Sequence, residues 1–138
     1  MPRKQKTLFI IKPDSVKRNL IGRILSRAEE AGFRVLNLRY LRLSKKDARK
    51  FYYVHEGKPF LPELVKYMSS GPCVPVLLEK ANAIADLREL IGATDPQKAK
   101  PGTIRADFAL SMTKNSVHAS DSPKSARFEV KFFFKNSR

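Results

Sequence analysis

Apolar residues cluster along the chain in short blocks separated by polar, helix-period segments. Four blocks have the length and the β-branched or aromatic content of strands, and the four are Thr7–Lys12, Phe33–Leu43, Gly71–Glu79 and Glu129–Phe134. The first is short, ends before Pro13 and is typical of a buried strand. Two prolines in Gly71–Glu79 indicate a strand that lies at an edge or starts irregularly.

Between these predicted strands, apolar residues recur at the spacing of an α-helix. Pro13–Ala31 carries an apolar stripe that stops before Gly32, and Ser44 begins a second helix that reaches about Val54, with Asp47 at its third position. Shorter helices are predicted within Lys58–Met68, over Asn82–Ile91 and over Pro123–Phe128.

Between Gly92 and Val117 the apolar residues follow neither a helical nor a strand period, and only Ile104–Phe108 predicts a turn of helix. A long irregular stretch in so short a chain indicates either a functional loop or disorder. The order of elements predicts an α+β fold: a ferredoxin-like βαββαβ antiparallel sheet with helices packed on it and a long loop insertion before the last strand. We expect residues 1–138 to form a single domain.

The charge of the chain is its unusual compositional feature. The formal net charge is +15, and 15 of the 28 Lys and Arg residues lie before residue 51 together with only 4 of the 13 acidic residues. This excess fits either a polyanionic partner or a solvated surface, and the sequence leaves both open. Cys73 is the only cysteine, so neither an intrachain disulfide nor a cysteine-based zinc site is possible. With no apolar run of membrane-spanning length, we expect a cytoplasmic protein without membrane association.

Of the two histidines, His118 is the better candidate for chemistry. It lies among small hydroxyl residues in Asn115–Ser122 at the end of the irregular stretch, where hydrogen-bond partners could fix its tautomer. The alternative is that this segment only caps the following helix through Ser120 and Ser122. His55 follows a helix beside Glu56 and is interpreted as a capping or surface residue.

Phosphate chemistry requires cations and donors that converge on the transferred group. Lys12 ends the first strand, Arg88 and Arg105 flank the irregular stretch, and Thr94 and Asn115 lie inside it. No P-loop, glycine-rich kinase loop or dinucleotide fingerprint is present. From the residues alone, we therefore expect a phosphate-handling site with a histidine as base or nucleophile.

These residues and several further motifs are similar to those of one family: the sequence resembles the nucleoside diphosphate kinase family over essentially its whole length. Asn115–Ser122 (NSVHASDS) is similar to the signature around the family's phosphorylated histidine, and Thr7–Asp14 (TLFIIKPD) is similar to its first strand. Further matching motifs, in order, are FYYVH (Phe51–His55), KPF (Lys58–Phe60), SSGP (Ser69–Pro72), GATDP (Gly92–Pro96) and PGTIRAD (Pro101–Asp107). Ala119 departs from the glycine common in the family, which implies slower rather than abolished catalysis.

The resemblance implies a ping-pong transfer of the γ-phosphoryl group from a nucleoside triphosphate, typically ATP, to a nucleoside diphosphate through a phosphohistidine at His118. Glu129 and Ser120 would orient the imidazole, and Tyr52 would brace the pocket. Lys12, Arg88, Thr94 and Arg105 would hold phosphates, while Asn115 and Lys12 would reach the ribose. Broad base specificity would follow from stacking on Phe60 beside Leu64 and Met112.

The same resemblance implies Mg²⁺ carried on the nucleotide phosphates, with Asp121 as the nearest acidic candidate to approach it. It also implies a homo-oligomer, a tetramer or a hexamer built from dimers paired through Phe33–Leu43. The alternative function is a nucleic-acid-binding ferredoxin-like module, which the positive charge suggests. The aromatic pattern of an RNA-recognition motif is absent from the third strand, CVPVLLE.

Overall fold

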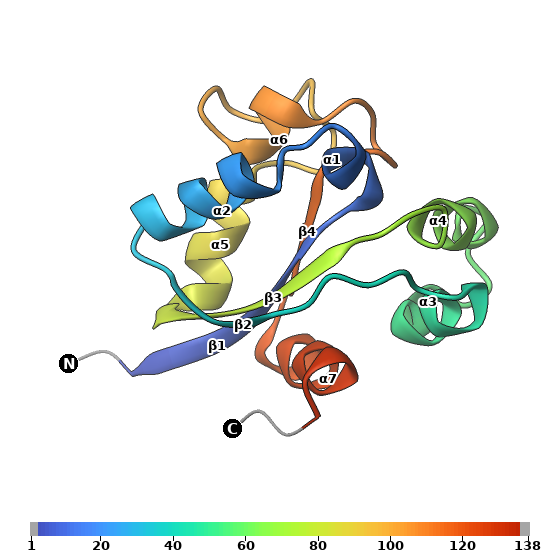
Figure 1. The fold of residues 1–138 in the computed structure, drawn as a ribbon, viewed down its shortest axis with the longest axis horizontal. Coiled ribbons are helices and arrows are strands. Elements are labelled where there is room, and N and C mark those ends of the chain that lie inside the picture. Colours follow the sequence, from blue (N-terminus) through green and yellow to red (C-terminus); the bar gives the residue numbers. More distant parts are fainter. Residues whose placement is uncertain (1–2, 136–138) are drawn as a thin grey trace.

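The sheet is formed by four antiparallel strands in the order β2-β3-β1-β4. The computed structural model describes residues 3–135. Its strands are β1 (Lys4–Ile11), β2 (Arg34–Leu38), β3 (Val74–Ala81) and β4 (Val117–Ala119) (Figure 1). The long strands β1 and β3 pair along their whole length at the centre, so every other element is positioned relative to them.

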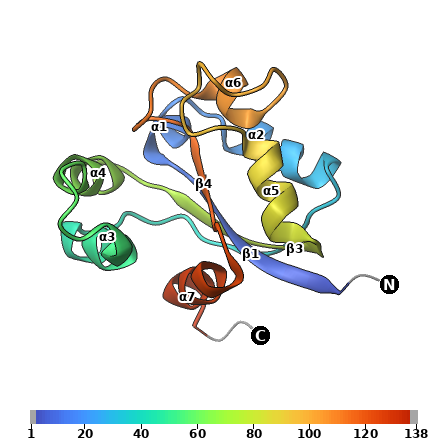
Figure 2. The same ribbon diagram turned by 180° about the vertical axis from the view of Figure 1, so that it is seen from behind.

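Helices cover both faces of this sheet (Figures 1 and 2). After β1 come α1 (Pro13–Lys17) and α2 (Ile21–Glu30), and α2 shares one face with α5 (Ala83–Ile91) and α6 (Ile104–Phe108). The other face carries α3 (Lys45–Phe51), the 3-10 helix η1 (Tyr53–His55), α4 (Leu61–Met68) and α7 (Pro123–Phe133). The predicted ferredoxin-like architecture is therefore confirmed.

Two hydrophobic cores form because β1 is apolar on both sides. Leu8 and Ile10 are fully buried beneath α3, α4 and α7, whereas Phe9 and Ile11 are fully buried beneath α2, α5 and α6. Successive strand residues point to opposite faces, so a continuous apolar run is what a central strand between two helical layers requires.

Most predicted elements are confirmed, with changes at their boundaries. The helix expected over Pro13–Ala31 is split into α1 and α2 because Asn19 adopts a left-handed conformation (φ 60°), which asparagine tolerates. Ser44 caps α3 as expected, its side chain accepting from the Asp47 amide at 3.0 Å. Strand β2 is shorter than predicted, with an isolated bridge between Leu41 and Cys73 beyond it.

Strand β3 is an interior strand rather than an edge strand, so that part of the prediction is wrong. Pro75 lacks an N–H, but its carbonyl still accepts from the Arg39 amide at 3.0 Å. The proline is therefore accommodated beside β2 with its remaining backbone polar group satisfied.

The predicted last strand, Glu129–Phe134, is also wrong, because these residues extend α7 to Phe133. Ser122 starts the helix with a capping box shared with Ser125. Helical spacing then buries Ala126, Glu129, Val130 and Phe133 on one side. The last strand is instead β4, and the long insertion, which contains α6 as predicted, precedes it.

Gly92 is a position where the fold demands glycine. Its φ is +88°, and an added Cβ would lie 2.5 Å from Oγ1 of Thr103, the residue that caps α6. Because α6 carries Arg105, whose Nη1 donates to the Gly92 carbonyl at 3.0 Å, a side chain here would disturb the placement of that guanidinium.

We predict that Gly92→Ala lowers the free energy of unfolding by about 1–3 kcal/mol, since it combines backbone strain with a clash. Urea denaturation measures the change. Gly22→Ala is the matched control, because no atom outside its chain neighbours and its own helix backbone lies within 4 Å of the added Cβ, and its φ is ordinary. The control should gain about 0.5 kcal/mol from helix propensity. Equal stabilities for the two variants would contradict the prediction.

Candidate active site

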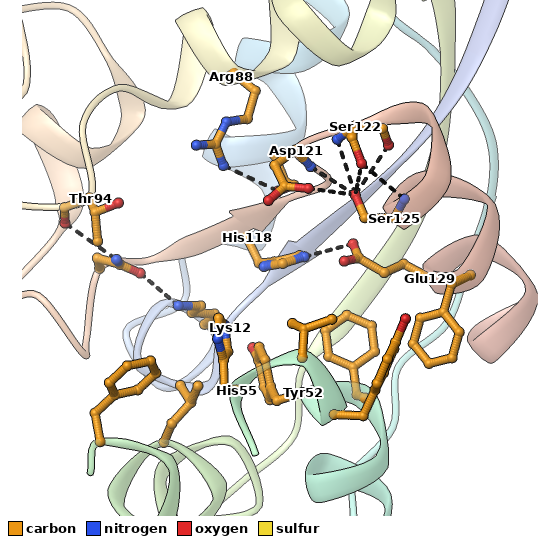
Figure 3. A pocket seen from close by; sticks show the side chains of 18 of the residues that line it. Lys12, Tyr52, His55, Arg88, Thr94, His118, Asp121, Ser122, Ser125 and Glu129 are labelled. Atoms are coloured by element: carbon orange, nitrogen blue, oxygen red, sulfur yellow. Dashed lines mark hydrogen bonds and ion pairs between the residues drawn. The ribbon is translucent and has the colours of Figure 1, made fainter. Parts of the chain in front are cut away.

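A cavity of about 730 Å³ opens where β1 and β4 meet the helices and the 92–116 segment. It has the size of a small-molecule site. Twelve of the thirteen candidate residues from the sequence line it: Lys12, Tyr52, Phe60, Leu64, Arg88, Thr94, Arg105, Met112, Asn115, His118, Asp121 and Glu129. Figure 3 labels Lys12, Tyr52, Arg88, Thr94, His118, Asp121 and Glu129 among them. Ser120 is the exception, and it is buried behind the lining.

His118 lies in β4 with its imidazole held by a carboxylate. Strand pairing sets it opposite Ile10 of β1. Its Nε2 is 2.8 Å from Oε1 of Glu129, which projects from α7, and Ser120 donates to the same oxygen at 2.8 Å. A carboxylate at Nε2 favours the tautomer that carries its proton there, which leaves a lone pair on Nδ1. The interaction predicted for these three residues is present, with Glu129 on a helix rather than at a strand start.

Aromatic rings enclose the imidazole. Phe51 and Tyr52 meet it edge-on, with ring centroids 5.4 Å and 6.2 Å away. Tyr52 is buried, and its hydroxyl has no hydrogen-bond partner among residues 3–135. Burial, followed by the nearby Glu129 charge, raises the pKa of Tyr52, so this hydroxyl stays protonated and can donate.

Lys12 is a buried cation at the end of β1. Its Nζ donates to Oδ1 of Asn115 at 2.7 Å, and the Asn115 amide nitrogen donates to the Thr94 carbonyl at 3.3 Å. Burial, and secondarily the Arg105 charge, lowers the pKa of Lys12 to about 7. An anion in the cavity would reverse this shift, because an opposite charge favours the ammonium form.

Two guanidinium groups complete the basic part of the cavity. Arg105 is buried and donates to the carbonyls of Gly92 and Val117 at 3.0 and 2.9 Å, yet its Nε is without a partner in the described chain. Burial and the neighbouring Arg88 lower the pKa of Arg105 to about 10. Arg88 is more exposed and reaches the Ala119 carbonyl only at 3.5 Å. Both therefore have donor capacity left for a ligand.

The mouth of the cavity is apolar on one side. Phe60 and Met112 are 49% and 62% exposed, and Leu64 is partly buried. His55 also lines the cavity, edge-on to Phe60 at 5.1 Å and stacked on Tyr52 at 6.0 Å. The interpretation of His55 as a capping or surface residue missed this position. The sequence feature that could have indicated this position is the aromatic run Phe51–His55, to which His55 belongs.

Acidic residues are scarce in this cavity. Asp121 lies at its edge and accepts from Ser125 Oγ at 2.7 Å. That hydrogen bond is the main reason that the pKa of Asp121 is lowered. Within residues 3–135, no cluster of three or more His, Cys, Asp or Glu side chains could hold a metal ion by itself. Sequence reasoning also missed Tyr53, Lys124, Ser125 and Phe128, which line the cavity from η1 and α7.

A histidine held by a carboxylate and facing several cations, on a ferredoxin-like sheet, provides the groups that phosphoryl transfer requires. Comparisons with known proteins agree. The family model for nucleoside diphosphate kinase matches residues 5–138. The chain is 55% identical over 130 residues to nucleoside diphosphate kinase from Desulfatibacillum aliphaticivorans, covering 94% of both chains, and 54% identical to that from Salinibacter ruber, covering 94% of this chain and 92% of the relative.

Solved structures show the same similarity. Nucleoside diphosphate kinase from Aquifex aeolicus superimposes with a TM-score of 0.95 at 44% identity, covering 97% of both chains. The halophilic enzyme from Halobacterium salinarum, solved in complex with CDP, gives 0.94 at 37% identity over 97% of this chain and 90% of that one. The chain belongs to the nucleoside diphosphate kinase family. Its activity is phosphotransfer from a nucleoside triphosphate to a nucleoside diphosphate, and the alternative of a nucleic-acid-binding module as its primary function is not favoured.

Proposed function

We propose that Nδ1 of His118 is the nucleophile of the kinase reaction. The observation that carries this proposal is the 2.8 Å contact between His118 Nε2 and Glu129, which leaves the lone pair on Nδ1. In the first half-reaction an N–P bond forms and the bond from the γ-phosphorus to its bridging oxygen breaks, with the electron pair leaving on the nucleoside diphosphate. The second half-reaction reverses these bonds on another nucleoside diphosphate.

The phosphates would be held by Lys12, Arg88, Arg105 and Thr94. Two buried donors without partners among the described residues, the Tyr52 hydroxyl and the Arg105 Nε, support an anionic ligand in this part of the cavity. A buried polar atom is normally satisfied, and phosphate oxygens would satisfy both. The cations would also neutralise charge that builds on the phosphoryl group during transfer.

The nucleoside would occupy the apolar side of the mouth. The half-exposed ring of Phe60 offers a stacking surface, and Leu64 and Met112 flank it without base-specific donors or acceptors. Because every base has a π-face, this environment supports broad base specificity. Asn115 and Lys12, already joined at 2.7 Å, would reach the ribose hydroxyls.

Mg²⁺ would enter on the nucleotide rather than on a site of its own. Among the described residues, Asp121 and Glu129 are the carboxylates that line the cavity, and Glu129 is engaged by His118 and Ser120. Asp121 alone would therefore be available, which suits an ion that keeps its water and phosphate ligands. When bound, Mg²⁺ would neutralise part of the charge of the phosphates. Asp121, whose lowered pKa keeps it ionised, would contact that ion or its waters.

We further propose one domain over residues 1–138, a homo-oligomer and a cytoplasmic location. Both cores share β1 and β3, which supports the single domain. Strand β2 lies at the sheet edge with Leu36, Leu38 and Tyr40 exposed, which supports dimers paired through it and then a tetramer or a hexamer. No helix within residues 3–135 is long and apolar enough to cross a membrane.

The nucleophile is tested by incubation with γ-labelled ATP. Wild type should retain a label that is stable to alkali and labile to acid, as an N–P bond is, and His118→Ala should retain none. His55→Ala is the matched control, since it removes the other histidine of the chain, and it should still be labelled. Labelling of His118→Ala would refute the assignment.

Glu129→Gln tests the orienting carboxylate. Glutamine keeps the size of the side chain but removes the charge that stabilises the Nε2 proton, so we predict that kcat falls by about 10²–10⁴-fold, the range for a lost acid–base partner. The KM for the nucleoside triphosphate should change little, because Glu129 lies behind the imidazole. A change in KM alone would contradict this role. Glu89→Gln, an exposed carboxylate on α5, is the control.

Proton uptake tests the role of Lys12. Since the pKa of Lys12 is about 7 in the free protein, most of it is neutral at about pH 8, and a bound polyphosphate should restore its charge. ADP binding at about pH 8, where the ADP phosphates are fully ionised, should therefore take up close to one proton. Calorimetry in two buffers of different ionisation enthalpy measures this. Lys12→Arg is always protonated and should show no uptake; unchanged uptake in that variant would exclude Lys12.

A further inference from the structure

Arg18, directly after α1, lies outside the cavity but holds both ends of a segment that lines it. Its Nη2 donates to the Phe108 carbonyl at 2.6 Å and is 3.5 Å from Oγ of Ser116. Between these two residues runs the 109–115 loop, which brings Asn115 to the cavity. One guanidinium nitrogen therefore closes the base of this loop, where α1 lies next to the end of α6 (Figures 1 and 2).

A buried carboxylate fixes the guanidinium in this position. Asp14 is buried, its Oδ2 accepts from Arg18 Nη2 at 3.1 Å, and its backbone carbonyl accepts from Arg18 Nε at 3.2 Å. The Tyr67 hydroxyl of α4 donates to the other carboxylate oxygen and accepts from the Asp14 amide at 3.1 Å. Burial, followed by this hydrogen bond, raises the pKa of Tyr67, so the hydroxyl stays protonated. Arg18 cannot turn away to solvent without leaving a buried charge unpaired.

Ser116 has a backbone conformation that depends on its surroundings. Its φ is +74°, in the left-handed region that residues other than glycine rarely adopt, and it is fully buried. Its carbonyl accepts from the Lys12 amide at 2.9 Å and from Ser15 Oγ at 3.2 Å. Such a conformation persists where the surrounding structure fixes it. Because this turn directly follows Asn115, whose Oδ1 accepts from Lys12 Nζ at 2.7 Å, a shift of Ser116 would move that amide.

We propose that Arg18 is a positioning residue for nucleotide binding: by closing the base of the 109–115 loop, it sets the place of Asn115 relative to Lys12. This role rests on the ribose contacts proposed above for Asn115 and Lys12. Arg18 itself would not touch the nucleotide, because its partners lie on α1 and at the two ends of the loop.

Arg27 of α2 is the matched comparison. It also binds the long insertion, through Asp107 at 2.6 Å and the Gly102 carbonyl at 3.3 Å. Its side chain is about as exposed as that of Arg18, at 31% against 34%. Both of its partners precede the 109–115 loop, so Arg27 anchors α6 rather than the far end of the loop. Loss of either arginine should lower stability, but only loss of Arg18 should change the affinity for a nucleotide.

Calorimetric titration with ADP tests this difference. Arg18→Met should weaken ADP binding by about three- to tenfold, the effect of one hydrogen bond that orders a ligand contact, whereas Arg27→Met should stay within about twofold of wild type. Destabilisation alone would lower the stoichiometry of binding and leave Kd unchanged. Steady-state kinetics should show a raised KM for the nucleoside diphosphate with kcat within about threefold, because Arg18 acts on the ribose contact rather than on His118.

A double-mutant cycle shows whether Arg18 acts through Asn115. Asn115→Ala should weaken ADP binding by about tenfold or more. Adding Arg18→Met to that variant should change Kd by less than about twofold, since the group that Arg18 positions is already gone. Ser15→Ala is a milder second variant, because it removes only one donor from the Ser116 carbonyl, and it should weaken ADP binding by about two- to fivefold.

Wild-type affinity of Arg18→Met would overturn the positioning role, as would wild-type affinity of Ser15→Ala where Arg18→Met does not fold. Additive losses in the double variant, or an equal loss of affinity in Arg27→Met, would also overturn it. Wild-type affinity of Asn115→Ala is a separate failure: it would refute the ribose contact in the proposed function, and the role of Arg18 with it.

Discussion

The pairing of β4 with β1 is the contact on which the site depends. Only Val117, His118 and Ala119 form the strand, yet their register against Phe9–Ile11 brings the C-terminal part of the chain beside the end of β1. The ladder continues past the strand, since the Lys12 amide donates to the Ser116 carbonyl at 2.9 Å. The cation that ends β1 and the imidazole of β4 therefore reach the same cavity because of backbone hydrogen bonds between two buried strands.

The other groups of the site are arranged around this pair by packing that serves the fold as well. Arg105 donates to the carbonyls of Gly92 and Val117 and so ties both ends of the long insertion together. Glu129 is carried by a helix whose Val130 and Phe133 lie in the core. Burying Lys12 and Arg105 costs free energy, which their lowered pKa values report. An anionic ligand bound beside these two cations would remove part of that cost.

Secondary structure could be predicted from the sequence where the local preference of a segment agreed with its place in the tertiary structure. The apolar run of β1, the Ser44 cap and the short helix α6 follow from residue type and spacing. Prediction failed at Glu129–Phe134, because three consecutive phenylalanines favour a strand locally, whereas the Ser122 cap and the burial of Val130 and Phe133 select a helix. Strand β4 is too short to give a periodic signal. Residue type and position already indicated His118 and the phosphate candidates Lys12, Arg88, Arg105, Thr94 and Asn115, and the motif resemblance added the others. Tyr53 and Phe128 enter the cavity through packing of η1 against α7, and His55 packs against Tyr52 and Phe60.

The positive charge of the chain divides into two parts with different physical origins. Lys12, Arg88 and Arg105 line the cavity, and burial together with a neighbouring cation lowers the pKa of Lys12 and of Arg105. The Lys and Arg residues that are exposed outside the cavity lie in solvent, where charge is cheap and screened by salt. Their summed positive field would raise the local concentration of anionic nucleotides near the mouth of the cavity.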